Sequence, residues 1–328
     1  MKAMVWTKYG SPEVLQLREV EKPAPKDNEV LIKVHAATVT AADCDFRKMQ
    51  GPIWTRIPVR ILVGIRKPGR ITILGQELAG DIAAVGKGVT RFKEGDPVFA
   101  PTLLRLGAYA EYKCLPESYP VLKPAGLSYE AAATIPTGGI NGLHFLRAAD
   151  VQAGESVLIN GAGGSIGTYA VQIAKSMGAE VTCVDSTEKL DMLRSIGADR
   201  SIDYTQADFT RTGETYDVII DVAGKSPFSG SVRALKPKGR YILGNASVSS
   251  MIRSRLTPMN QEKKVIVAVA GYPAEYYAFL KALIEAGQLK PVIDRCYPLE
   301  ELAEAHRYVE NGHKKGNVVI TVSHDNKT

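Results

Sequence analysis

A glycine-rich turn between an apolar strand and an amphipathic helix constrains this chain more than any other feature. The turn reads NGAGGSIGT over residues 160–168, directly after the apolar run SVLIN at residues 156–160. Read as AxGxxG, it uses Ala162 as the small residue at a tight turn, Gly164 where backbone meets a ligand, and Gly167 where helix meets strand. Because a helix N-terminus offers unpaired amides and the positive end of a dipole, the turn predicts a binding site for a dinucleotide pyrophosphate.

Strand and helix patterns alternate from Ser156 onward, whereas the first ~120 residues are rich in short strands separated by turns. Regular alternation of this kind produces a doubly wound parallel sheet with helices on both faces. A length of 328 residues favours two domains, because single cores rarely grow beyond roughly 250–300 residues. We therefore expect a β-rich N-terminal domain and a dinucleotide-binding domain that contains the glycine-rich turn.

The second strand of the alternating part ends at Asp185, eighteen residues after Gly167. A carboxylate there would accept hydrogen bonds from an adenosine ribose and would repel a 2′-phosphate. Ser186, Thr187 and Lys189 follow it, and these are the donors that a 2′-phosphate needs. Each feature has a structural alternative, since Asp185 could cap the next helix and Lys189 could be a solvated lysine on that helix.

The cysteines, the N-terminus and the hydropathy exclude several classes of protein. The four cysteines lie at least 69 residues apart, so no CxxC or CxxH spacing supports a zinc ribbon or a dithiol redox motif. The opening MKAMVWTKYG enters a strand pattern without a signal-peptide stretch, and no window approaches the roughly 20 apolar residues of a transmembrane helix. We expect a cytoplasmic protein with reduced cysteines.

Further motifs are spread over nearly the whole chain: GQELAGD, VGKGVTRFKEGDPVFA, AYAEYKCLPE, RSIGADRSIDY, YDVIIDVAG, LKPKGRYILGNAS and KKGNVVITV. Together with the glycine-rich turn, they resemble the medium-chain dehydrogenase/reductase superfamily, and within it the zinc-free quinone oxidoreductase-like branch. The resemblance implies an α/β fold with a Rossmann doubly wound parallel sheet at residues 123–265, the dinucleotide-binding domain, plus a GroES-like β-rich catalytic domain formed by residues 1–122 and 266–328. It also implies a nicotinamide cofactor in the crevice between the domains.

Zinc-dependent members of this superfamily place a cysteine where Thr40 stands, a histidine where Gln76 stands, and a third ligand near residues 136–137. None of these positions holds a residue type suited to zinc, so the resemblance implies that no metal is bound. Zinc polarises an isolated carbonyl while hydride moves. A quinone or an α,β-unsaturated carbonyl spreads the developing charge over a conjugated system, so a few hydrogen-bond donors suffice. We expect reduction of such a small hydrophobic acceptor rather than alcohol oxidation.

The resemblance also assigns candidate site residues. Thr40, Asp43 and Thr137 are the candidates closest to the reaction, although a structural cap is the alternative for Asp43. The pyrophosphate would contact Ala162, Gly163, Gly164, Ser165, Ile166 and Gly167. The adenosine end would contact Asp185, Ser186, Lys189 and Tyr204, and the nicotinamide end would contact Gly224 and Asn245. NADPH is the expected cofactor, and NADH is the alternative because Asp185 departs from the usual NADPH pattern.

The basic residues are concentrated in one stretch. The net charge is +6, but residues 46–76 contain seven basic residues and no acidic one, which leaves 34 basic against 35 acidic residues elsewhere. A broadly basic surface for nucleic acid is therefore not expected. Apolar residues alternate with these charges, so the stretch could be a lid over a hydrophobic acceptor, a peripheral contact with an anionic membrane, or a surface helix with a core face.

The favoured function is a zinc-independent NAD(P)H-dependent oxidoreductase that transfers hydride to a conjugated carbonyl acceptor. The alternatives are an NAD(P)-dependent alcohol dehydrogenase and a non-catalytic NADPH-binding protein with RNA or membrane association. We also expect a homodimer, because relatives commonly pair through an exposed edge of the Rossmann sheet.

Overall fold

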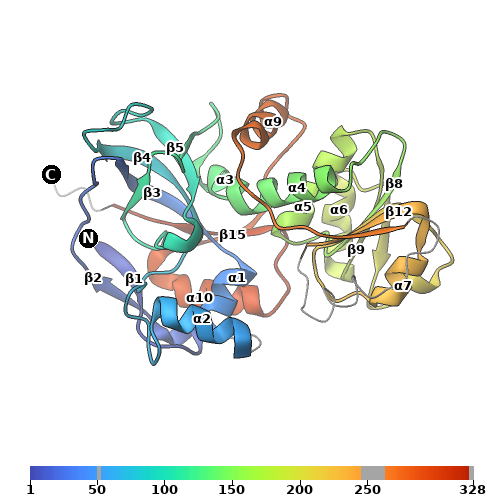
Figure 1. The fold of residues 1–328 in the computed structure, drawn as a ribbon, viewed down its shortest axis with the longest axis horizontal. Coiled ribbons are helices and arrows are strands. Elements are labelled where there is room, and N and C mark those ends of the chain that lie inside the picture. Colours follow the sequence, from blue (N-terminus) through green and yellow to red (C-terminus); the bar gives the residue numbers. More distant parts are fainter. Residues whose placement is uncertain (50–52, 245–262, 325–328) are drawn as a thin grey trace. The chain divides into compact units, whose positions relative to one another are not determined.

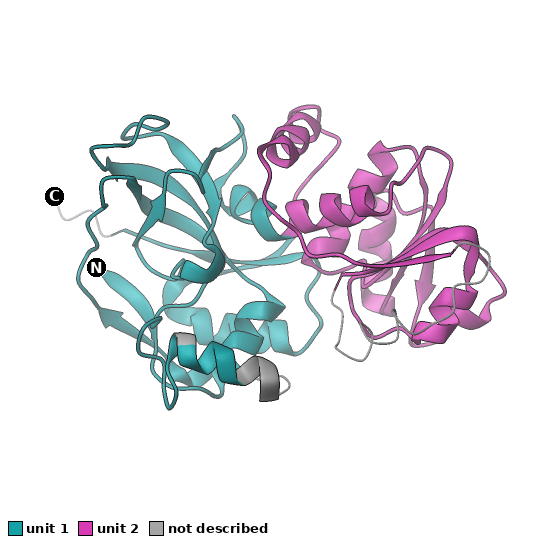
Figure 2. Ribbon diagram, in the orientation of Figure 1, with its two compact units in different colours: residues 1–137, 293–328 teal, residues 138–292 magenta. Residues whose placement is uncertain are grey.

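The computed structural model describes residues 1–49, 53–244 and 263–324. The chain divides into two compact units, which are coloured separately in Figure 2. The first unit consists of Met1–Thr137 and Ile293–Thr328, and the second consists of Gly138–Val292. The chain thus leaves the first unit once and returns to it near its C-terminus.

The first unit contains a seven-stranded sheet and a separate antiparallel pair, β1 with β2 (Figure 1). The sheet has the order β14-β15-β3-β4-β5-β7, and β6 also pairs with β3. Only β14 and β15 pair in parallel. The strands are β1 (Lys2–Trp6), β2 (Leu15–Glu19), β3 (Glu29–Val39), β4 (Glu77–Val85), β5 (Pro97–Pro101), β6 (Tyr112–Pro116), β7 (Val121–Leu122), β14 (Ile293–Pro298) and β15 (Asn317–Thr321).

The α-helices described in this unit are α1 (Ala41–Lys48), α2 (Ile53–Val63), α3 (Tyr129–Ala133) and α10 (Leu302–Glu310). Strand β3 lies at the centre of the unit, because β15, β4 and β6 pair with it and helices α3 and α10 pack on it. Its side chains are therefore buried on both faces, and Ile32 and Val34 join the apolar core with Trp6 and Leu78. Burial on both faces is the main stabilising contribution to a strand of this kind.

The second unit is built on six parallel strands with the order β10-β9-β8-β11-β12-β13 (Figure 1). The strands are β8 (Ser156–Asn160), β9 (Glu180–Asp185), β10 (Arg200–Asp203), β11 (Tyr216–Asp221), β12 (Leu235–Leu243) and β13 (Lys264–Val267). The sheet starts at β8 and is extended in one direction by β9 and β10 and in the other by β11 to β13. This strand order is that of the Rossmann fold, so the predicted fold class is confirmed.

Helices connect the parallel strands: α5 (Ser165–Ser176) packs against β8 and β9, and α6 (Leu190–Ser195) packs against β9 and β10. Helix α7 (Phe228–Arg233) packs against β12, and α4 (Ile140–Ala148) packs against α5 and α9 (Ala274–Glu285). Since crossovers between parallel strands are right-handed, the two halves of the sheet place their helices on opposite faces. The carboxyl ends of β8 and β11, where the winding reverses, form the edge at which such folds bind ligands.

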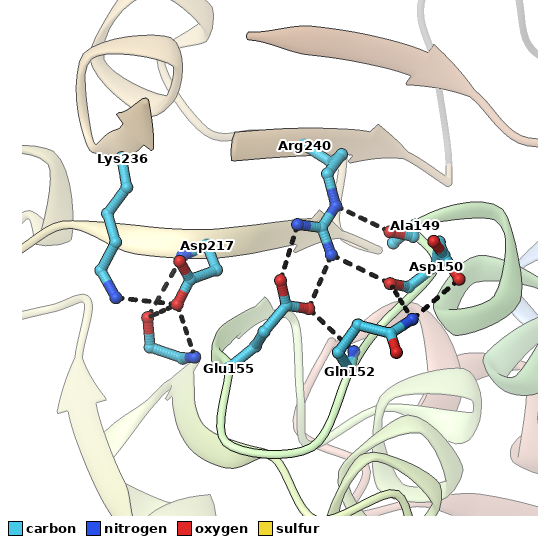
Figure 3. A network of polar contacts seen from close by, with 8 residues as sticks. Ala149, Asp150, Gln152, Glu155, Asp217, Lys236 and Arg240 are labelled. Carbon is cyan, nitrogen blue, oxygen red and sulfur yellow. Dashed lines mark hydrogen bonds and ion pairs between the residues drawn. The ribbon is translucent and has the colours of Figure 1, made fainter. Parts of the chain in front are cut away.

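Ion pairs tie the opposite, N-terminal edge of this sheet together (Figure 3). Arg240 of β12 binds both carboxylate oxygens of Glu155, just before β8, at 2.8 and 2.6 Å, and its Nε donates to the carbonyl of Ala149. Asp217 of β11 pairs with Lys236 of β12 at 2.7 Å. Bidentate arginine pairs are among the stronger surface interactions, so they stabilise the sheet at the N-terminal ends of its strands. The carboxyl ends of the strands do not take part in these pairs.

The compact units differ from the expected domain boundaries at both junctions. Residues 123–137 lie with the first unit, because α3 packs against β3 and β4. Residues 266–292 lie with the second unit, because β13 pairs with β12 and α9 packs against α4. Among the described residues, no helix is long and apolar enough to cross a membrane.

Candidate functional site

The glycine-rich turn joins β8 to α5 at the carboxyl edge of the second unit's sheet. Gly161 has φ +81° and is the left-handed residue of the turn. Ala162, the small residue expected at the tight turn, follows it directly. A Cβ on Gly167 would lie 2.5 Å from the carbonyl oxygen of Ala162, so only glycine permits this approach of helix and strand. At Gly164, the N-cap of α5, a Cβ would meet only the Gly161 carbonyl at 3.6 Å. The turn therefore has room for a ligand beside the first amides of α5.

Asp185, at the end of β9, is bound to the glycine-rich turn. Its Oδ2 accepts a hydrogen bond of 2.7 Å from the amide of Gly163, and its Oδ1 lies 3.2 Å from Nζ of Lys189. Both residues are buried, with 6% of Asp185 and 7% of Lys189 exposed. Lys189 is therefore not the solvated lysine of the alternative interpretation. Ser186, not Asp185, occupies the N-cap position of the turn that follows β9.

The other residues predicted to bind the adenosine end lie close to this ion pair. The amide of Ser186 donates to Oδ1 of Asp185 at 2.9 Å, and the amide of Tyr204 donates to the carbonyl of Asp185 at 3.1 Å. The side chain of Tyr204 is 60% exposed. The structure thus brings Asp185, Ser186, Lys189 and Tyr204 together at the carboxyl ends of β9 and β10.

Gly224 follows β11 and adopts φ +66°, and its amide donates to Oδ1 of Asp221 at 2.8 Å. The same Asp221 oxygen accepts from the side chain of Asn160 at 2.9 Å, which links the end of β11 to the end of β8. Gly224 therefore lies at the same sheet edge as the glycine-rich turn. Asn245, which we predicted near the nicotinamide, lies outside the described residues.

In the first unit, Thr40 and Asp43 form a reciprocal cap at the start of α1. The amide of Asp43 donates to Oγ1 of Thr40 at 3.2 Å, and Oδ2 of Asp43 accepts from the amide of Thr40 at 3.0 Å and from its hydroxyl at 2.7 Å. Nε2 of Gln76 donates to the same Thr40 oxygen at 3.1 Å. The structural cap considered for Asp43 is thus present, and the side chain of Gln76 contacts it.

Glu77, the first residue of β4, binds two threonines beside this cap. One carboxylate oxygen accepts from the hydroxyl of Thr38, and the other accepts from the amide of Thr137 at 2.6 Å. The antiparallel register of β3 and β4 explains this arrangement, because Ala37 pairs with Leu78 and so brings Thr38 to Glu77. Thr40, Asp43 and Thr137, predicted from distant parts of the sequence, therefore lie in one buried polar cluster.

Burial raises the pKa values of both carboxyls in this cluster. It raises the pKa of Asp43 to about 6, against hydrogen bonds from Thr40, Tyr109 and Gln76 that lower it. Burial raises the pKa of Glu77 to about 7, against hydrogen bonds from Thr38 and Thr137, and the nearby Asp43 carboxylate adds to the rise. Buried carboxyls with raised pKa values in a polar cluster are typical of functional sites, although structural networks also produce them.

Sequence reasoning missed Glu77 and Thr38, and it treated Gln76 only as a missing zinc ligand. An acidic residue at the start of a buried strand was the available signal for Glu77. Thr38 gave no signal, because threonine is common in strands and Thr38 lies between apolar residues near the end of β3. Only the pairing of β3 with β4 connects these residues.

A second group in the first unit has metal-binding residue types, with the ligand atoms of Cys44, His306 and Glu310 within 4.8 Å of one another. Arg47 occupies this position: its guanidinium, which is fully buried, pairs with Glu310 and donates from Nε to Nδ1 of His306 at 3.4 Å. Burial raises the pKa of the Cys44 thiol to about 12, and burial together with Arg47 and Lys48 lowers the pKa of His306 to about 3. A neutral thiol beside a guanidinium does not suit a divalent cation, so this group is structural.

Comparisons with known proteins cover nearly the whole chain. Residues 26–126 match the alcohol dehydrogenase GroES-like domain family, and residues 196–320 match the zinc-binding dehydrogenase family. The quinone oxidoreductase of Homo sapiens is 33% identical in an alignment of 325 positions that covers 95% of this chain and 94% of that protein. The chloroplastic NADPH-dependent alkenal/one oxidoreductase of Arabidopsis thaliana is 32% identical in an alignment of 334 positions that covers 98% of this chain and 79% of that protein.

Among solved structures, the quinone oxidoreductase from Coxiella burnetii superposes with a TM-score of 0.88 at 27% identity, covering 98% of this chain and 99% of that chain. A GroES-like β unit and a Rossmann unit with a glycine-rich turn together define an NAD(P)H-dependent oxidoreductase. The chain belongs to the medium-chain dehydrogenase/reductase superfamily, in its quinone oxidoreductase-like branch. The predicted family and the predicted class of enzyme are confirmed.

Proposed function

We propose that this chain is a zinc-independent, NADPH-dependent reductase of quinones or α,β-unsaturated carbonyl compounds. The observation that carries the proposal is the bond between Thr40 and Gln76, which stand where zinc-dependent members carry a cysteine and a histidine. Their hydroxyl and amide are hydrogen-bonding groups rather than zinc ligands. Such groups suit an acceptor that spreads its developing charge over a conjugated system. The names of the human and Arabidopsis relatives agree with these acceptor classes.

The second unit has the residues that a dinucleotide needs. The amides at the start of α5 and the open position at Gly164 would hold the pyrophosphate, from Ala162 to Gly167. Gly224, at the end of β11, would lie toward the nicotinamide end, as would Asn245. When bound, the reduced nicotinamide supplies the hydride that the acceptor receives.

The preference for NADPH rests on Lys189. Its ammonium group pairs with the Asp185 carboxylate at the carboxyl end of β9. The amide of Ser186 binds the same carboxylate, and the amide of Tyr204 binds the backbone carbonyl of Asp185. A 2′-phosphate would compete with Asp185 for this cation, and it is the stronger anion at neutral pH. The Arabidopsis relative is named as NADPH-dependent, which supports the same choice.

The test is steady-state oxidation of NADPH and NADH by the purified chain over a panel of quinones, enones, aldehydes and simple ketones, with metal analysis of the same sample. We expect turnover of quinones or enones with NADPH, and a zinc content far below one ion per chain. Oxidation of simple alcohols by a sample with one zinc per chain would instead identify an alcohol dehydrogenase. Retention on RNA with no turnover of any acceptor would identify the non-catalytic alternative.

Helix α2 and the turn after it support a peripheral membrane contact within the basic stretch. Val63 is fully buried and Val59 packs against the core, whereas Ile57 and Ile61, on the opposite face of the helix, are 54% and 58% exposed. Ile65 follows with 70% exposed, beside the exposed cations of Arg66 and Lys67. An apolar face next to cations, with no acidic residue between positions 46 and 76, fits an anionic lipid surface. Arg47 and Lys48 belong to the buried Glu310 ion pairs and are not part of this surface.

Vesicle sedimentation tests this contact. The chain should sediment with vesicles of phosphatidylcholine and phosphatidylserine and remain in solution with phosphatidylcholine alone. The double variant Arg66→Ser/Lys67→Ser should weaken binding roughly 30-fold, since each cation near such a surface contributes about 1 kcal/mol. The matched controls Lys87→Ser/Lys93→Ser and Leu122→Ser, at exposed positions in the same unit, should bind like the wild type. A lid is the correct interpretation if Ile61→Ser changes KM for apolar acceptors and no vesicle binds.

The exposed edge of the second unit's sheet supports a homodimer. Strand β13 pairs only with β12 within the described part of the chain, so its other side presents unpaired backbone groups. We expect sedimentation equilibrium to give twice the chain mass of 35.5 kDa. The amide of Ala268 donates to Leu243 of β12, so the amide of Val267 points to the other side of β13. A proline in place of Val267, which removes this outward donor, should shift the chain toward monomer if this edge forms the contact.

A further inference from the structure

The carboxylate of Asp203 joins the two turns at which the adenosine of the proposed cofactor would lie. Asp203 is the last residue of β10 and pairs with Asp185 in the register of β10 and β9. Its Oδ2 accepts hydrogen bonds from the hydroxyl of Thr187, in the turn after β9, and from Nε2 of Gln206 at 3.0 Å. Its Oδ1 accepts from the amide and the hydroxyl of Thr205, in the turn after β10, at 2.9 and 2.7 Å. One carboxylate therefore holds the two turns together.

The bond with Asp203 uses the only hydroxyl proton of Thr187. Hydrogen bonds from Thr187 and Thr205 lower the pKa of Asp203 below its ordinary value, so the carboxylate is ionised at neutral pH and can only accept. Thr187 must therefore be the donor, and its oxygen has only lone pairs left for another group. The oxygens of a phosphate dianion also only accept. Thr187, one of the donors that the sequence offers to a 2′-phosphate, is thus not available to it.

Asp203 also changes the charge at this end of the sheet. The ammonium group of Lys189 pairs with the carboxylate of Asp185, so these two charges cancel. The carboxylate of Asp203 then leaves a net charge of −1 on the three side chains, which are two carboxylates and one ammonium group. A 2′-phosphate carries a charge of about −1.5 to −2 and would be repelled, whereas the 2′-hydroxyl of a plain ribose is neutral.

We propose that Asp203 is a second residue, beside Asp185, that determines the choice between NADPH and NADH. It withholds the hydroxyl of Thr187 from a 2′-phosphate, and it adds a repulsive charge. This inference rests on the proposed function, because the adenosine of the cofactor must lie at the turns after β9 and β10. Lys189 then favours NADPH and Asp203 opposes it, so the chain discriminates less between the two cofactors than Lys189 alone would cause.

Binding of two cofactor fragments tests the effect of the charge. Adenosine 2′,5′-bisphosphate and 5′-AMP differ only in the 2′-phosphate, and neither contains the nicotinamide. Asp203→Asn removes the charge but keeps an oxygen that can accept from Thr187. By calorimetry, we expect this variant to bind the bisphosphate about fivefold more tightly than the wild type and to bind 5′-AMP unchanged. The gain should shrink in about 0.5 M salt, because Thr187 and its surroundings are exposed.

The hydroxyl of Thr187 is tested by a double-mutant cycle. Asp203→Ala removes the charge and also frees the hydroxyl, so it should tighten bisphosphate binding about 20-fold. Thr187→Val alone should change this affinity less than about twofold, because the hydroxyl serves Asp203 in the wild type. Thr187→Val added to Asp203→Ala should reduce the gain to about that of Asp203→Asn. Urea unfolding of each variant shows that it is folded.

Asp208→Asn is the matched control. Oδ1 of Asp208 accepts from the amide and the hydroxyl of Thr210 at 2.9 and 2.7 Å, in the same way as Asp203 accepts from Thr205. The control variant should bind both fragments like the wild type. If Asp208→Asn tightens bisphosphate binding as much as Asp203→Asn, a general change of surface charge explains the gain, and the inference is wrong.

The fragments also separate this inference from the reductase function. A chain that reduces no acceptor, but whose Asp203 variants bind the bisphosphate more tightly, would refute the reductase function and leave the role of Asp203 intact. An active reductase whose Asp203→Asn and Asp203→Ala variants bind the bisphosphate no better than the wild type would overturn the inference alone. A large loss of bisphosphate binding in Thr187→Val would also overturn it, because the hydroxyl would then already serve the phosphate.

Discussion

The amide of Gly163 donates a hydrogen bond of 2.7 Å to the Asp185 carboxylate, so the glycine-rich turn and the end of β9 are joined by one residue that also pairs with Lys189. In the sequence, Asp185 favours NADH and Lys189 favours NADPH, and the ion pair between the two residues explains this conflict. A carboxylate that would repel a 2′-phosphate instead neutralises the lysine that would attract one. The preference between NADPH and NADH then depends on how readily Lys189 leaves Asp185.

Asp185→Ala should raise the preference for NADPH over NADH at least about 10-fold, measured as the ratio of kcat/KM values. Removal of the carboxylate frees the Lys189 cation and removes a like charge from the phosphate site. Asp185→Asn is a gentler version, because its side-chain oxygen can still accept from the Gly163 amide. Asp191→Ala removes a fully exposed carboxylate nearby in the sequence and should leave the ratio unchanged. An unchanged ratio in Asp185→Ala would show that Asp185 does not act on the cofactor.

The variants Gly164→Ala and Gly167→Ala should separate the role of the glycine-rich turn in NADPH binding from its role in the stability of the fold. A Cβ at Gly167 meets backbone carbonyls at close range, so we expect this variant to lose about 1–3 kcal/mol of stability in urea unfolding. A Cβ at Gly164 has room and an extended backbone, so that variant should fold normally but bind NADPH at least about 10-fold more weakly in calorimetry. Normal NADPH binding by Gly164→Ala would place the pyrophosphate elsewhere.

The buried carboxyl of Glu77 predicts a pH dependence of stability. Its pKa is raised from 4.5 to about 7 in the folded chain, so between these values the folded state holds a proton that the unfolded state has lost. The free energy of unfolding should therefore decrease as pH rises from about 4.5 to 7, by roughly 2–4 kcal/mol from this group.

Glu77→Gln should flatten this part of the profile, because glutamine does not titrate. Urea unfolding at a series of pH values measures it, and Glu94→Gln, at an exposed carboxylate of the same unit, is the control. The nearby Asp43 also contributes, and it should leave a smaller slope between its ordinary pKa and about 6. Identical slopes in wild type and Glu77→Gln would contradict the raised pKa.

Chelators should not affect turnover. The hydroxyl of Thr40 and the amide of Gln76 stand at two of the three ligand positions of zinc-dependent relatives, and Arg47 occupies the space between Cys44, His306 and Glu310. Prolonged dialysis against phenanthroline should leave kcat and the melting temperature unchanged, with a zinc-dependent alcohol dehydrogenase as the positive control. A loss of activity that added zinc restores would contradict the zinc-independent function.

Much of the fold could be predicted from local patterns. The strand–turn–helix that begins at residue 156 was recognised from its apolar run and its glycines. Strand β10 gives no clear signal, because Arg200–Asp203 is short, polar and only partly buried. The start of strand β12 at Leu235 is hidden for a similar reason, because its early residues include lysine, proline and glycine, which disfavour strands locally.

The sequence by itself determined the Rossmann topology, the phosphate-binding turn and the lack of zinc-ligand residue types, because each depends on residues that are close together along the chain or on residue identity alone. Only the tertiary structure decided which charges are paired and which polar side chains bind one another. Lys189 and Arg47 look like solvated cations in the sequence, but the packing of β9 and α10 buries each against a carboxylate. The pairing of β3 with β4 places Gln76 beside Thr40, because sheet register joins residues that are 36 positions apart.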